Sequence, residues 1–341
     1  MERIYNYTRK ALEDYFTSIG EKAFKGRQVF EWLYRHKVKS FDEMTSLKKD
    51  LRDKLKEDFT FDGIKLLKKQ EGKDVIKYLF KLIDNEFVEA VLMKQVYGNS
   101  LCISTEVGCN MGCTFCESGR LKLHKKLEVY EIVMQILLAE EDLKERISHV
   151  VFMGIGEPFD NYDNFIKAVE LINDDLGLAI GARHITVSTC GLVPKIKEFM
   201  DFPYQVNLAI SLHAATDEVR DKLMPINKVY PLDVLIPALK EYILKTGRRL
   251  TVEYILIKDI NDREIDAHNL VNLLKDMNVY INLIPYNETS HIAYKRPSNN
   301  QIMKFYDIIK KSNIAVTIRK EFGGEIDAAC GQLRSKQKEN L

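Results

Sequence analysis

Three cysteines, Cys109, Cys113 and Cys116, lie within eight residues at the spacing C-x-x-x-C-x-x-C. Three closely spaced thiolates can bind three irons of a 4Fe-4S cluster, which leaves the fourth iron without a protein ligand. A small molecule with suitable donor atoms can then chelate that open iron. The spacing therefore predicts a cluster that binds a ligand directly.

An open iron of this kind suits S-adenosylmethionine (SAM), whose amino and carboxylate groups can chelate it. An electron from the cluster then breaks the sulfonium bond and yields a 5′-deoxyadenosyl radical, which takes hydrogen from unactivated carbon. The alternatives are a zinc knuckle or three structural cysteines. Zinc needs a fourth Cys or His nearby, and the near candidate is His124, eight residues after Cys116 in a basic loop. The spacing and the aromatic Phe115 favour the cluster.

The composition is that of an ordinary globular protein. The chain has 341 residues, of which 45% are hydrophobic and 30% charged, and this length suits one large domain with a smaller appendage. The sequence contains no run of about 18 apolar residues, so we expect no membrane span. The first residues do not resemble a signal peptide. Six cysteines, three of them clustered, indicate a reducing compartment with a metal site, so we expect a cytoplasmic protein.

The first 80 residues carry a small positive excess, with 19 Lys and Arg against 14 Asp and Glu, although the net charge of the whole chain is +1. Apolar residues at helical spacing predict short helices over residues 7–58. We therefore expect a helical N-terminal domain over residues 1–60 whose basic face contacts RNA. The cations expected to contact RNA phosphates are Lys25, Arg27 and Lys37 of this domain and Arg120, Lys122, Lys125 and Lys126 of the loop after the cysteines. A solvated helical surface is the alternative. Residues 61–97 follow as a β-rich linker region, with strands near 78–82 and 88–93.

Strand and helix patterns alternate from residue 98 to the end of the chain, and such units imply right-handed crossovers and a parallel sheet. At least six units are present, so the pattern predicts an α/β fold with a partial TIM-like (β/α)6 barrel over residues 98–341. The expected strands are 101–107, 149–153, 185–188, 206–212, 250–257, 279–284 and 314–318. The expected helices include residues 129–137, 165–172, 232–245, 264–276 and 299–311.

Glycine and polar residues follow several of these strands, at the rim where such a barrel collects its chemistry. Gly156 lets the backbone approach a ligand closely, and Glu157 beside it can accept a hydrogen bond from the SAM ammonium group. Ser188 ends the third strand, and Asn287 follows the sixth, where it could bind the ribose or amino acid part of SAM. The fourth strand ends in Ser211, Leu212 and His213. Each signal is weak alone, and their shared place on one rim carries the prediction.

Three cysteines lie outside the cluster motif. Cys190 follows the third strand and is expected to be buried filler. Cys102 precedes Cys109 by seven residues, on the strand that leads into the cluster loop. Cys330 lies among Ala and Gly residues near the C-terminus, where small neighbours leave room for something large to approach. A buried structural cysteine is the alternative for each.

Several of these stretches together resemble the RlmN/Cfr family of radical SAM methyltransferases, which act on RNA adenine, and the likeness covers nearly the whole chain. It rests on the cluster motif and on the presence of both Cys102 and Cys330, which is more specific than a three-cysteine motif alone. The segment at residues 318–323 is closer to RlmN than to Cfr. The other matching segments are residues 25–34, 40–45, 88–93, 107–109, 154–158, 211–213 and 326–334.

The resemblance implies a role for each candidate residue. Cys330 would take a methyl group from one SAM and become S-methylcysteine, and a second SAM would supply the radical that removes a hydrogen from that methyl. The carbon radical would add to carbon 2 of adenine, after which Glu89 or Cys102 would take the ring proton. Cys102 would then attack the sulfur of Cys330, forming a disulfide and releasing methyladenosine. The implied cluster ligands are Cys109, Cys113 and Cys116, and the implied SAM-binding residues are Gly156, Glu157, Ser188, Ser211, Leu212, His213 and Asn287.

The resemblance also implies substrates and partners. RlmN-type enzymes act on one adenosine of 23S rRNA and on the adenosine next to the anticodon of certain tRNAs. We expect a monomer that takes electrons from an external donor such as flavodoxin or ferredoxin. The alternatives are Cfr-type methylation of carbon 8 of the same rRNA adenosine, which gives antibiotic resistance, and a non-enzymatic iron–sulfur protein that binds RNA. One stretch departs from the family: Glu117 places a charge beside the cluster, and Lys126 replaces an expected asparagine.

Overall fold

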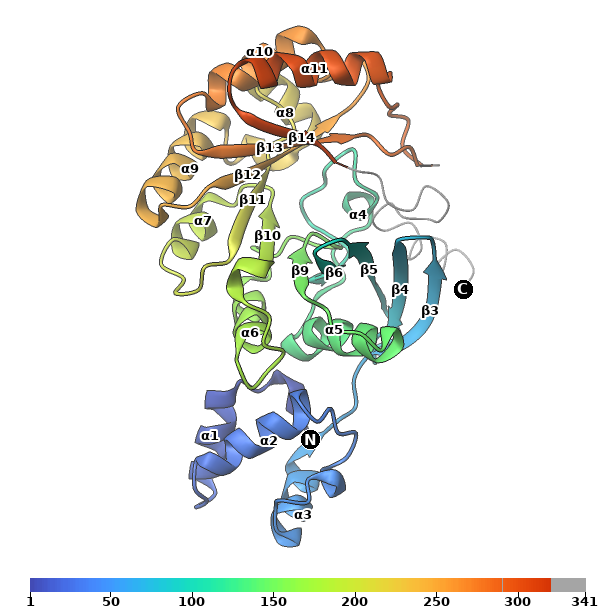
Figure 1. Cartoon of the computed structure of the whole chain (residues 1–341), viewed down its shortest axis with the longest axis vertical. Helices are drawn as coiled ribbons and strands as arrows, with labels where there is room; N and C mark the ends of the chain where they lie inside the picture. Colours follow the sequence, from blue (N-terminus) through green and yellow to red (C-terminus); the bar gives the residue numbers. More distant parts are fainter. Residues whose placement is uncertain (290, 320–341) are drawn as a thin grey trace.

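Three α-helices form most of the N-terminal domain in the computed structural model, which describes residues 1–289 and 291–319. α1 (Arg9–Ser18) and α2 (Phe24–Tyr34) pack so closely at Gly26 that an added Cβ would lie 2.5 Å from the backbone of Leu12. α3 (Lys49–Asp58) completes the group, which lies below the rest of the molecule in Figure 1. The short helices predicted over this part of the chain are thus confirmed.

Ten strands of the described residues form one sheet. The strand β6 (Gly98–Cys102) divides it, because β6 pairs antiparallel with β5 (Phe87–Gln95) and parallel with β9 (His149–Phe152). Beyond β5 the sheet continues with antiparallel β4 (Val75–Lys81) and β3 (Lys65–Glu71). Beyond β9 the parallel strands are β10 (Ile185–Thr189), β11 (Asn207–Ser211), β12 (Leu250–Leu256), β13 (Val279–Pro285) and β14 (Ala315–Ile318).

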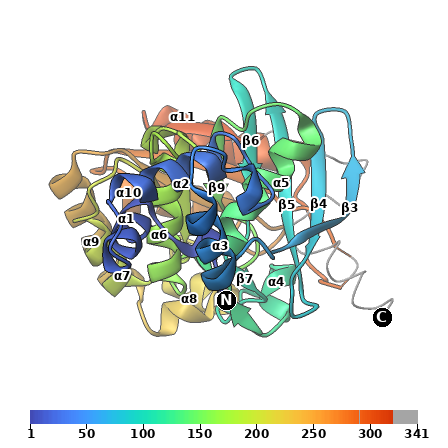
Figure 2. The same cartoon turned by 90° about the horizontal axis from the view of Figure 1, so that it is seen from below.

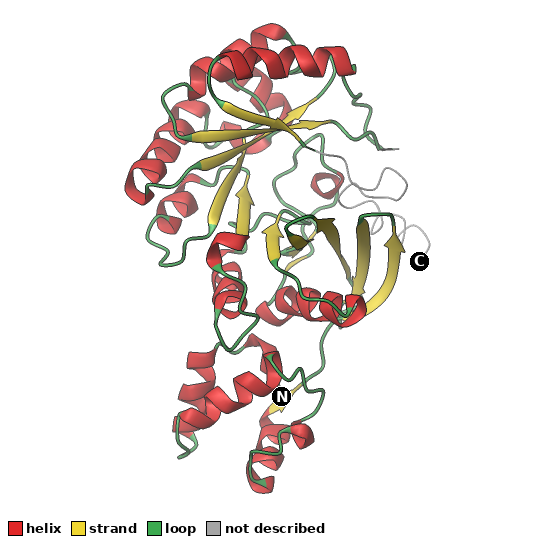
Figure 3. Cartoon of the chain, viewed as in Figure 1, coloured by secondary structure: helices red, strands yellow, loops and turns green. Residues whose placement is uncertain are grey.

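Helices follow the parallel strands and cover the outer side of the curved sheet, as Figures 1 and 3 show. The strand interiors are apolar, with Val187, Ile210 and Val252 all buried. The sheet ends at β14 and β3, so the barrel stays open, and the predicted α/β fold with a partial barrel is confirmed. The helices are α5 (Val129–Leu143), α6 (Tyr162–Asn173), α7 (Val193–Phe199), α8 (Asp217–Leu223), α9 (Leu232–Thr246), α10 (Glu264–Leu274) and α11 (Asn299–Lys311).

The elements that the sequence pattern did not predict include β3, α7 and α8. β3 is an edge strand whose residues are mostly exposed, so it lacks the alternation that marks a half-buried strand. α7 and α8 have seven residues each, which is too short for helical periodicity to show. β3, β4 and β5 also extend the same sheet as the barrel, so residues 61–97 are structurally continuous with it.

The N-terminal domain lies against α5 and the end of α6, and Figure 2 shows its helices in front of the barrel when the molecule is seen from below. Ion pairs join the two parts: Lys37 to Glu140 at 2.7 Å, and Arg9 to Asp174 at 3.1 Å. Lys39 also pairs with Glu141 of α5. No helix among the described residues is long and apolar enough to cross a membrane.

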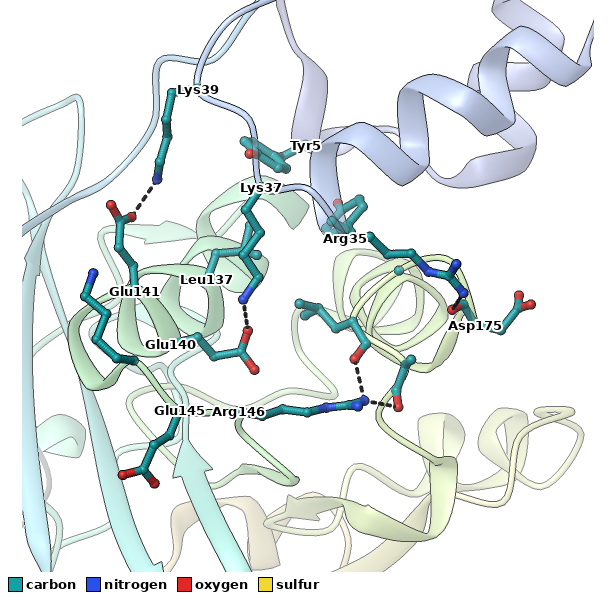
Figure 4. Close-up of a pocket in the computed structure, with 15 residues that line it drawn as sticks. Tyr5, Arg35, Lys37, Lys39, Leu137, Glu140, Glu141, Glu145, Arg146 and Asp175 are labelled. Atoms are coloured by element: carbon teal, nitrogen blue, oxygen red, sulfur yellow. Dashed lines mark hydrogen bonds and ion pairs between the residues drawn. The ribbon is translucent and has the colours of Figure 1, made fainter. Parts of the chain in front are cut away.

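A groove of about 690 Å³ lies along this junction (Figure 4). Its lining mixes the two charges. Lys37 and Lys39 enter from the N-terminal domain and meet Glu140 and Glu141 of α5, and Arg35 points toward Asp175. Because the cations already face carboxylates, the groove has no strong excess of either charge.

Candidate cluster and cofactor site

The cysteine loop begins after β7 (Glu106–Val107), which pairs with β8 (Lys125–Lys126) and so closes the loop at its base. Gly108 makes this closure possible: its φ is +85°, and an added Cβ would lie 2.1 Å from the carbonyl oxygen of Lys122. The Cys109 amide donates to the Leu121 carbonyl at 3.1 Å. These backbone contacts fix the two ends of the loop that carries all three cysteines.

The three thiols of the loop are partly buried, and burial raises the pKa of each. For Cys113 the pKa rises to about 12. Amide groups of Gly119 and Ser118 act in the opposite direction on Cys116 by hydrogen bonding to its sulfur. Thiolates in such apolar surroundings require a nearby cation, and three soft thiolates are the donor set that iron–sulfur clusters use.

Within residues 1–289 and 291–319, no three His, Cys, Asp or Glu side chains converge closely enough to hold a single metal ion. In a four-iron cluster each thiolate binds a different iron, so the ligands lie further apart than those of a single ion. His124, the candidate fourth ligand for zinc, places Nδ1 3.2 Å from a carboxylate oxygen of Glu86. The residues present therefore fit the predicted cluster, and the zinc alternative gains no support.

Other elements hold the loop from both sides. The Thr114 amide donates to the Leu223 carbonyl at the end of α8 at 3.0 Å, and the ring of Phe115 meets the edge of His213 at a centroid distance of 4.8 Å. Glu117, which departs from the family pattern, is buried and accepts a hydrogen bond from Thr289. The Glu117 carboxylate thus links the cysteine loop to the segment that follows β13.

The turn after β9 carries Gly156 and Glu157. Gly156 has a φ of +107°, and an added Cβ would lie 2.6 Å from the Cβ of Glu106, so this turn requires glycine. The Glu157 carboxylate is buried and accepts from the Cys190 amide at 2.8 Å and from the Phe159 amide at 3.0 Å. Its oxygens retain further lone pairs, and burial raises its pKa.

The next strand ends also meet. The hydroxyl oxygens of Ser188 and Ser211 lie 3.2 Å apart, and Leu212 is fully buried behind them. His213 has a φ of +59°, and its Nδ1 accepts from the Ile255 amide at 3.1 Å. Burial lowers its pKa to about 3, so the imidazole is neutral at physiological pH. Asn287 is exposed after β13.

Cys102 and Glu89 lie on neighbouring strands, β6 and β5, and share one face of the sheet with Lys77 of β4. Lys77 stands opposite Val91, which stands opposite Cys102, and side chains of directly opposed residues lie on the same face. The Lys77 ammonium lies 3.0 Å from a Glu89 oxygen, with both side chains buried. Burial raises the pKa of the Cys102 thiol to about 11. Cys330 lies outside the described residues.

Most cations that the sequence suggested for RNA contact have carboxylate partners within the protein. Lys25 binds Glu21 within α2 and its preceding turn at 2.7 Å, and Lys126 binds Asp160 at 3.0 Å. Such pairing lowers the number of cations that are free to bind phosphate. The other expected cations with a partner are Arg27 with Glu13, Lys37 with Glu140, Arg120 with Glu117, and Lys125 with Asp84 and Glu131.

The structure adds three charged residues that sequence reasoning missed: Glu106, Lys77 and Arg220. Each is fully buried next to the predicted site residues. Lys77 could have been found from the sequence, because a cation within the otherwise apolar strand at residues 75–80 indicates a buried charge. Glu106 and Arg220 carried no such signal, since an acid near a motif or an arginine in a short helix is most often a solvated surface residue.

Comparison with known proteins identifies the family. Residues 3–60 match the family described as the ribosomal RNA large subunit methyltransferase N-terminal domain, and residues 103–271 match the radical SAM superfamily. A probable dual-specificity RNA methyltransferase RlmN of Enterococcus faecalis is 54% identical over 345 residues, covering 98% of this chain and 97% of that protein. The chain belongs to the RlmN family.

Two further relatives agree with this placement in the RlmN family. A protein of the same description from Spiroplasma citri is 48% identical, with 98% of each chain covered. A crystal structure of a radical SAM methyltransferase from Sphaerobacter thermophilus gives a TM-score of 0.92 at 37% identity, covering 97% of this chain and 99% of that chain. The resemblance inferred from sequence is confirmed, and the chain is a radical SAM methyltransferase, a class that works with a 4Fe-4S cluster and SAM.

Proposed function

We propose that this chain methylates carbon 2 of an adenosine in 23S rRNA and of the adenosine next to the anticodon in tRNAs. The similar proteins are described as dual-specificity RNA methyltransferases, and the N-terminal match is to a domain of ribosomal RNA methyltransferases. The observation that carries the proposal is the Cys102 thiol beside the Lys77–Glu89 pair. A protein that only held a cluster would need neither group.

The bound cluster and two SAM molecules per turnover supply the methyl group and the one-electron chemistry. Cys109, Cys113 and Cys116 hold the cluster. The residues that hold SAM are Gly156, Glu157, Ser188, Ser211, Leu212, His213 and Asn287. Cys330 accepts the methyl group as S-methylcysteine and presents its carbon to carbon 2 of the adenine ring. The base must leave its stack to reach a barrel mouth.

Glu89 and Cys102 complete the reaction in this proposal. Glu89 or Cys102 takes the proton from carbon 2, and the Lys77 ammonium holds the Glu89 carboxylate in place at 3.0 Å. Once the radical adduct has lost one electron to the one-electron couple that the cluster would supply, Cys102 attacks the sulfur of Cys330 as a thiolate. The S–S bond forms as the bond from that sulfur to the adduct carbon breaks, and the released carbon takes up a proton to become the methyl group of methyladenosine. Burial raises the pKa of the Cys102 thiol to about 11, while Arg319 and Lys77 act in the opposite direction.

Two cysteine variants test this division of labour. Cys330→Ala should form no methylated protein and no methylated RNA while it keeps its cluster. Cys102→Ala should still form the carbon bond to RNA and should accumulate a covalent adduct, visible as a shifted, RNase-sensitive band on a denaturing gel. Cys190→Ala is the matched control, because that thiol has no role in the proposal. Normal turnover by Cys102→Ala, or RNA methylation by Cys330→Ala, would overturn the mechanism.

The position of the methyl group is tested separately. Mass spectrometry of nucleosides from 23S rRNA fragments and tRNA, incubated with the reconstituted enzyme, should yield 2-methyladenosine. A product of 8-methyladenosine would replace the proposal with Cfr-type chemistry. We further propose that the enzyme is a cytoplasmic monomer that receives electrons from a flavodoxin or ferredoxin.

A further inference from the structure

Arg220 is a charged side chain with no exposed surface, and it belongs to α8, the short helix after β11. A guanidinium stays protonated in a protein interior because its ordinary pKa lies far above neutrality. Burying such a charge is unfavourable unless every N–H group finds an acceptor. A buried arginine at a cofactor site therefore requires an account of its partners.

The acceptors around Arg220 are all neutral. Its Nε donates to the carbonyl of Leu212 at 3.1 Å, one terminal nitrogen donates to Oδ1 of Asn227 at 2.7 Å, and the other donates to the carbonyl of Cys190 at 2.7 Å. The Ser211 carbonyl lies 3.5 Å from the same terminal nitrogen. These bonds engage all three nitrogens of the guanidinium, but they do not cancel its positive charge.

Two carboxylates lie near Arg220, but the side chain of Asn227 separates them from the guanidinium. Asp217 and Asp221 each accept a hydrogen bond from Nδ2 of Asn227 at 2.8 Å. Asn227 thus separates both acids from the guanidinium, and within the described part of the chain Arg220 forms no ion pair. Both aspartates are exposed, so water screens them more than it screens the buried cation.

The uncancelled charge lies beside the cysteine loop. The helix that carries Arg220 ends at Leu223, whose carbonyl binds the Thr114 amide at 3.0 Å. Cys113 packs on the same apolar cluster as Cys190 and Leu223. The Cys190 residue that packs there is also the one whose carbonyl accepts from Arg220 at 2.7 Å, so the guanidinium and Cys113 share one neighbour.

We propose that Arg220 is a buried cation that raises the reduction potential of the cluster held by Cys109, Cys113 and Cys116. The inference rests on the cluster site of the proposed function. Reduction adds one electron from a low-potential donor to a thiolate-bound cluster, and Arg220 neither gains nor loses a proton. A fixed positive charge stabilises the more negative, reduced form more than the oxidised form, and net charge around a cluster is a main determinant of its potential.

Because its side chain is fully buried and its N–H groups already bind carbonyl oxygens, Arg220 does not contact SAM or RNA directly. Its role is electrostatic. The choice of neutral partners matters here, because a carboxylate in place of Asn227 would cancel the charge that the cluster otherwise experiences.

The test is a redox titration of the anaerobically reconstituted full-length chain, followed by electron paramagnetic resonance, with dithionite as reductant. Arg220→Gln keeps amide donors for the carbonyls but removes the charge. At a fixed potential the ratio of reduced to oxidised cluster in this variant should fall at least about tenfold. For a one-electron couple this equals a midpoint potential about 59 mV more negative. Arg220→Lys should stay close to wild type. An unchanged midpoint in Arg220→Gln with full iron content, or an equal shift in Arg220→Lys, would overturn the proposal.

A charge-exchange variant covers the case in which Arg220→Gln does not retain its cluster. Asn227→Asp/Asp221→Asn keeps the shapes and the net charge but moves one carboxylate against the guanidinium. Its midpoint should shift to a more negative value, and a midpoint equal to that of wild type would contradict the proposal. Absence of a reduced-cluster signal in wild type would instead refute the cluster site itself, so the two failures are distinguishable.

Discussion

Replacing Glu106 by glutamine should stabilise the protein, and the gain should grow as the pH rises. The Glu106 side chain is fully buried, and its Oε2 accepts from the Glu157 amide at 2.9 Å. Its Oε1 and the Oδ2 of Asp160 are both buried without a hydrogen-bond partner. Asp160 acts on Glu106 both as a like charge and as a hydrogen-bond partner of the protonated acid, and both effects favour a protonated Glu106. Glutamine retains the acceptor for Glu157 and adds an NH2 group, so it needs no proton.

The magnitude follows from the pKa of Glu106, which burial, together with Asp160 and Glu157, raises from 4.5 to about 8. Between these values the folded protein binds more protons at this site than the unfolded chain does. Wild-type stability therefore falls as the pH rises through this window, and the loss is complete above about pH 8. At 1.36 kcal/mol for each pKa unit the upper bound is about 5 kcal/mol. We expect about half of this bound, about 2–3 kcal/mol.

Thermal unfolding followed by circular dichroism at pH 5 and pH 8, under anaerobic conditions, measures the effect. At about 2 °C for each kcal/mol, Glu106→Gln should raise the Tm by about 5 °C at pH 8 and by little at pH 5. Glu241→Gln is the control, because that side chain is 57% exposed. Equal shifts at both pH values, or a lower Tm at pH 8, would refute the reasoning.

Three further predictions concern the same site. Lys77→Met leaves Glu89 buried without its cation and should cost about 3–5 kcal/mol in the free energy of unfolding, measured by urea titration; adding Glu89→Leu should recover much of that loss, and a double variant no more stable than the single one would contradict this. Glu117→Ala should weaken SAM binding about tenfold by calorimetry, since the buried carboxylate holds the segment after β13, and an unchanged Kd would show that the contact is dispensable. Gly156→Ala should abolish SAM binding while far-ultraviolet circular dichroism stays native, because its Cβ would lie 2.6 Å from that of Glu106; retained binding would mean that the turn can relax.

The sequence predicted the architecture well where periodicity was strong. α9, α10 and α11 begin and end close to the expected residues, because each buries an apolar stripe against the sheet. The parallel strands were equally clear, since strands such as β12 have both faces covered and consist mostly of apolar residues. β3 was missed for the opposite reason, because an exposed edge strand rich in lysine has no face that must be apolar.

The candidate site was predictable only where a motif or a strand end marked it. Ser188 and Ser211 meet at 3.2 Å because neighbouring parallel strands end at one rim. Arg220 could not be placed in this way, since its partners come from three separate segments that only the fold brings together. For the basic residues the sequence could not show the partners. Lys126 and Lys37 are expected to face RNA, and the structure adds that each has a carboxylate of the same chain at 2.7–3.0 Å.

The ion pairs between the N-terminal domain and α5 bear on how RNA affinity is measured. The slope of affinity against salt concentration counts the counterions that phosphates release, provided that the protein itself does not respond to salt. In this chain the pairs of Lys37 with Glu140 and Lys39 with Glu141 are screened by that same salt. If Lys37 leaves Glu140 to bind a phosphate, both the attachment of the N-terminal domain to α5 and the binding of RNA change. The slope therefore reports the attachment of the domain together with the contacts to RNA, and a variant that lacks Glu140 and Glu141 would separate them.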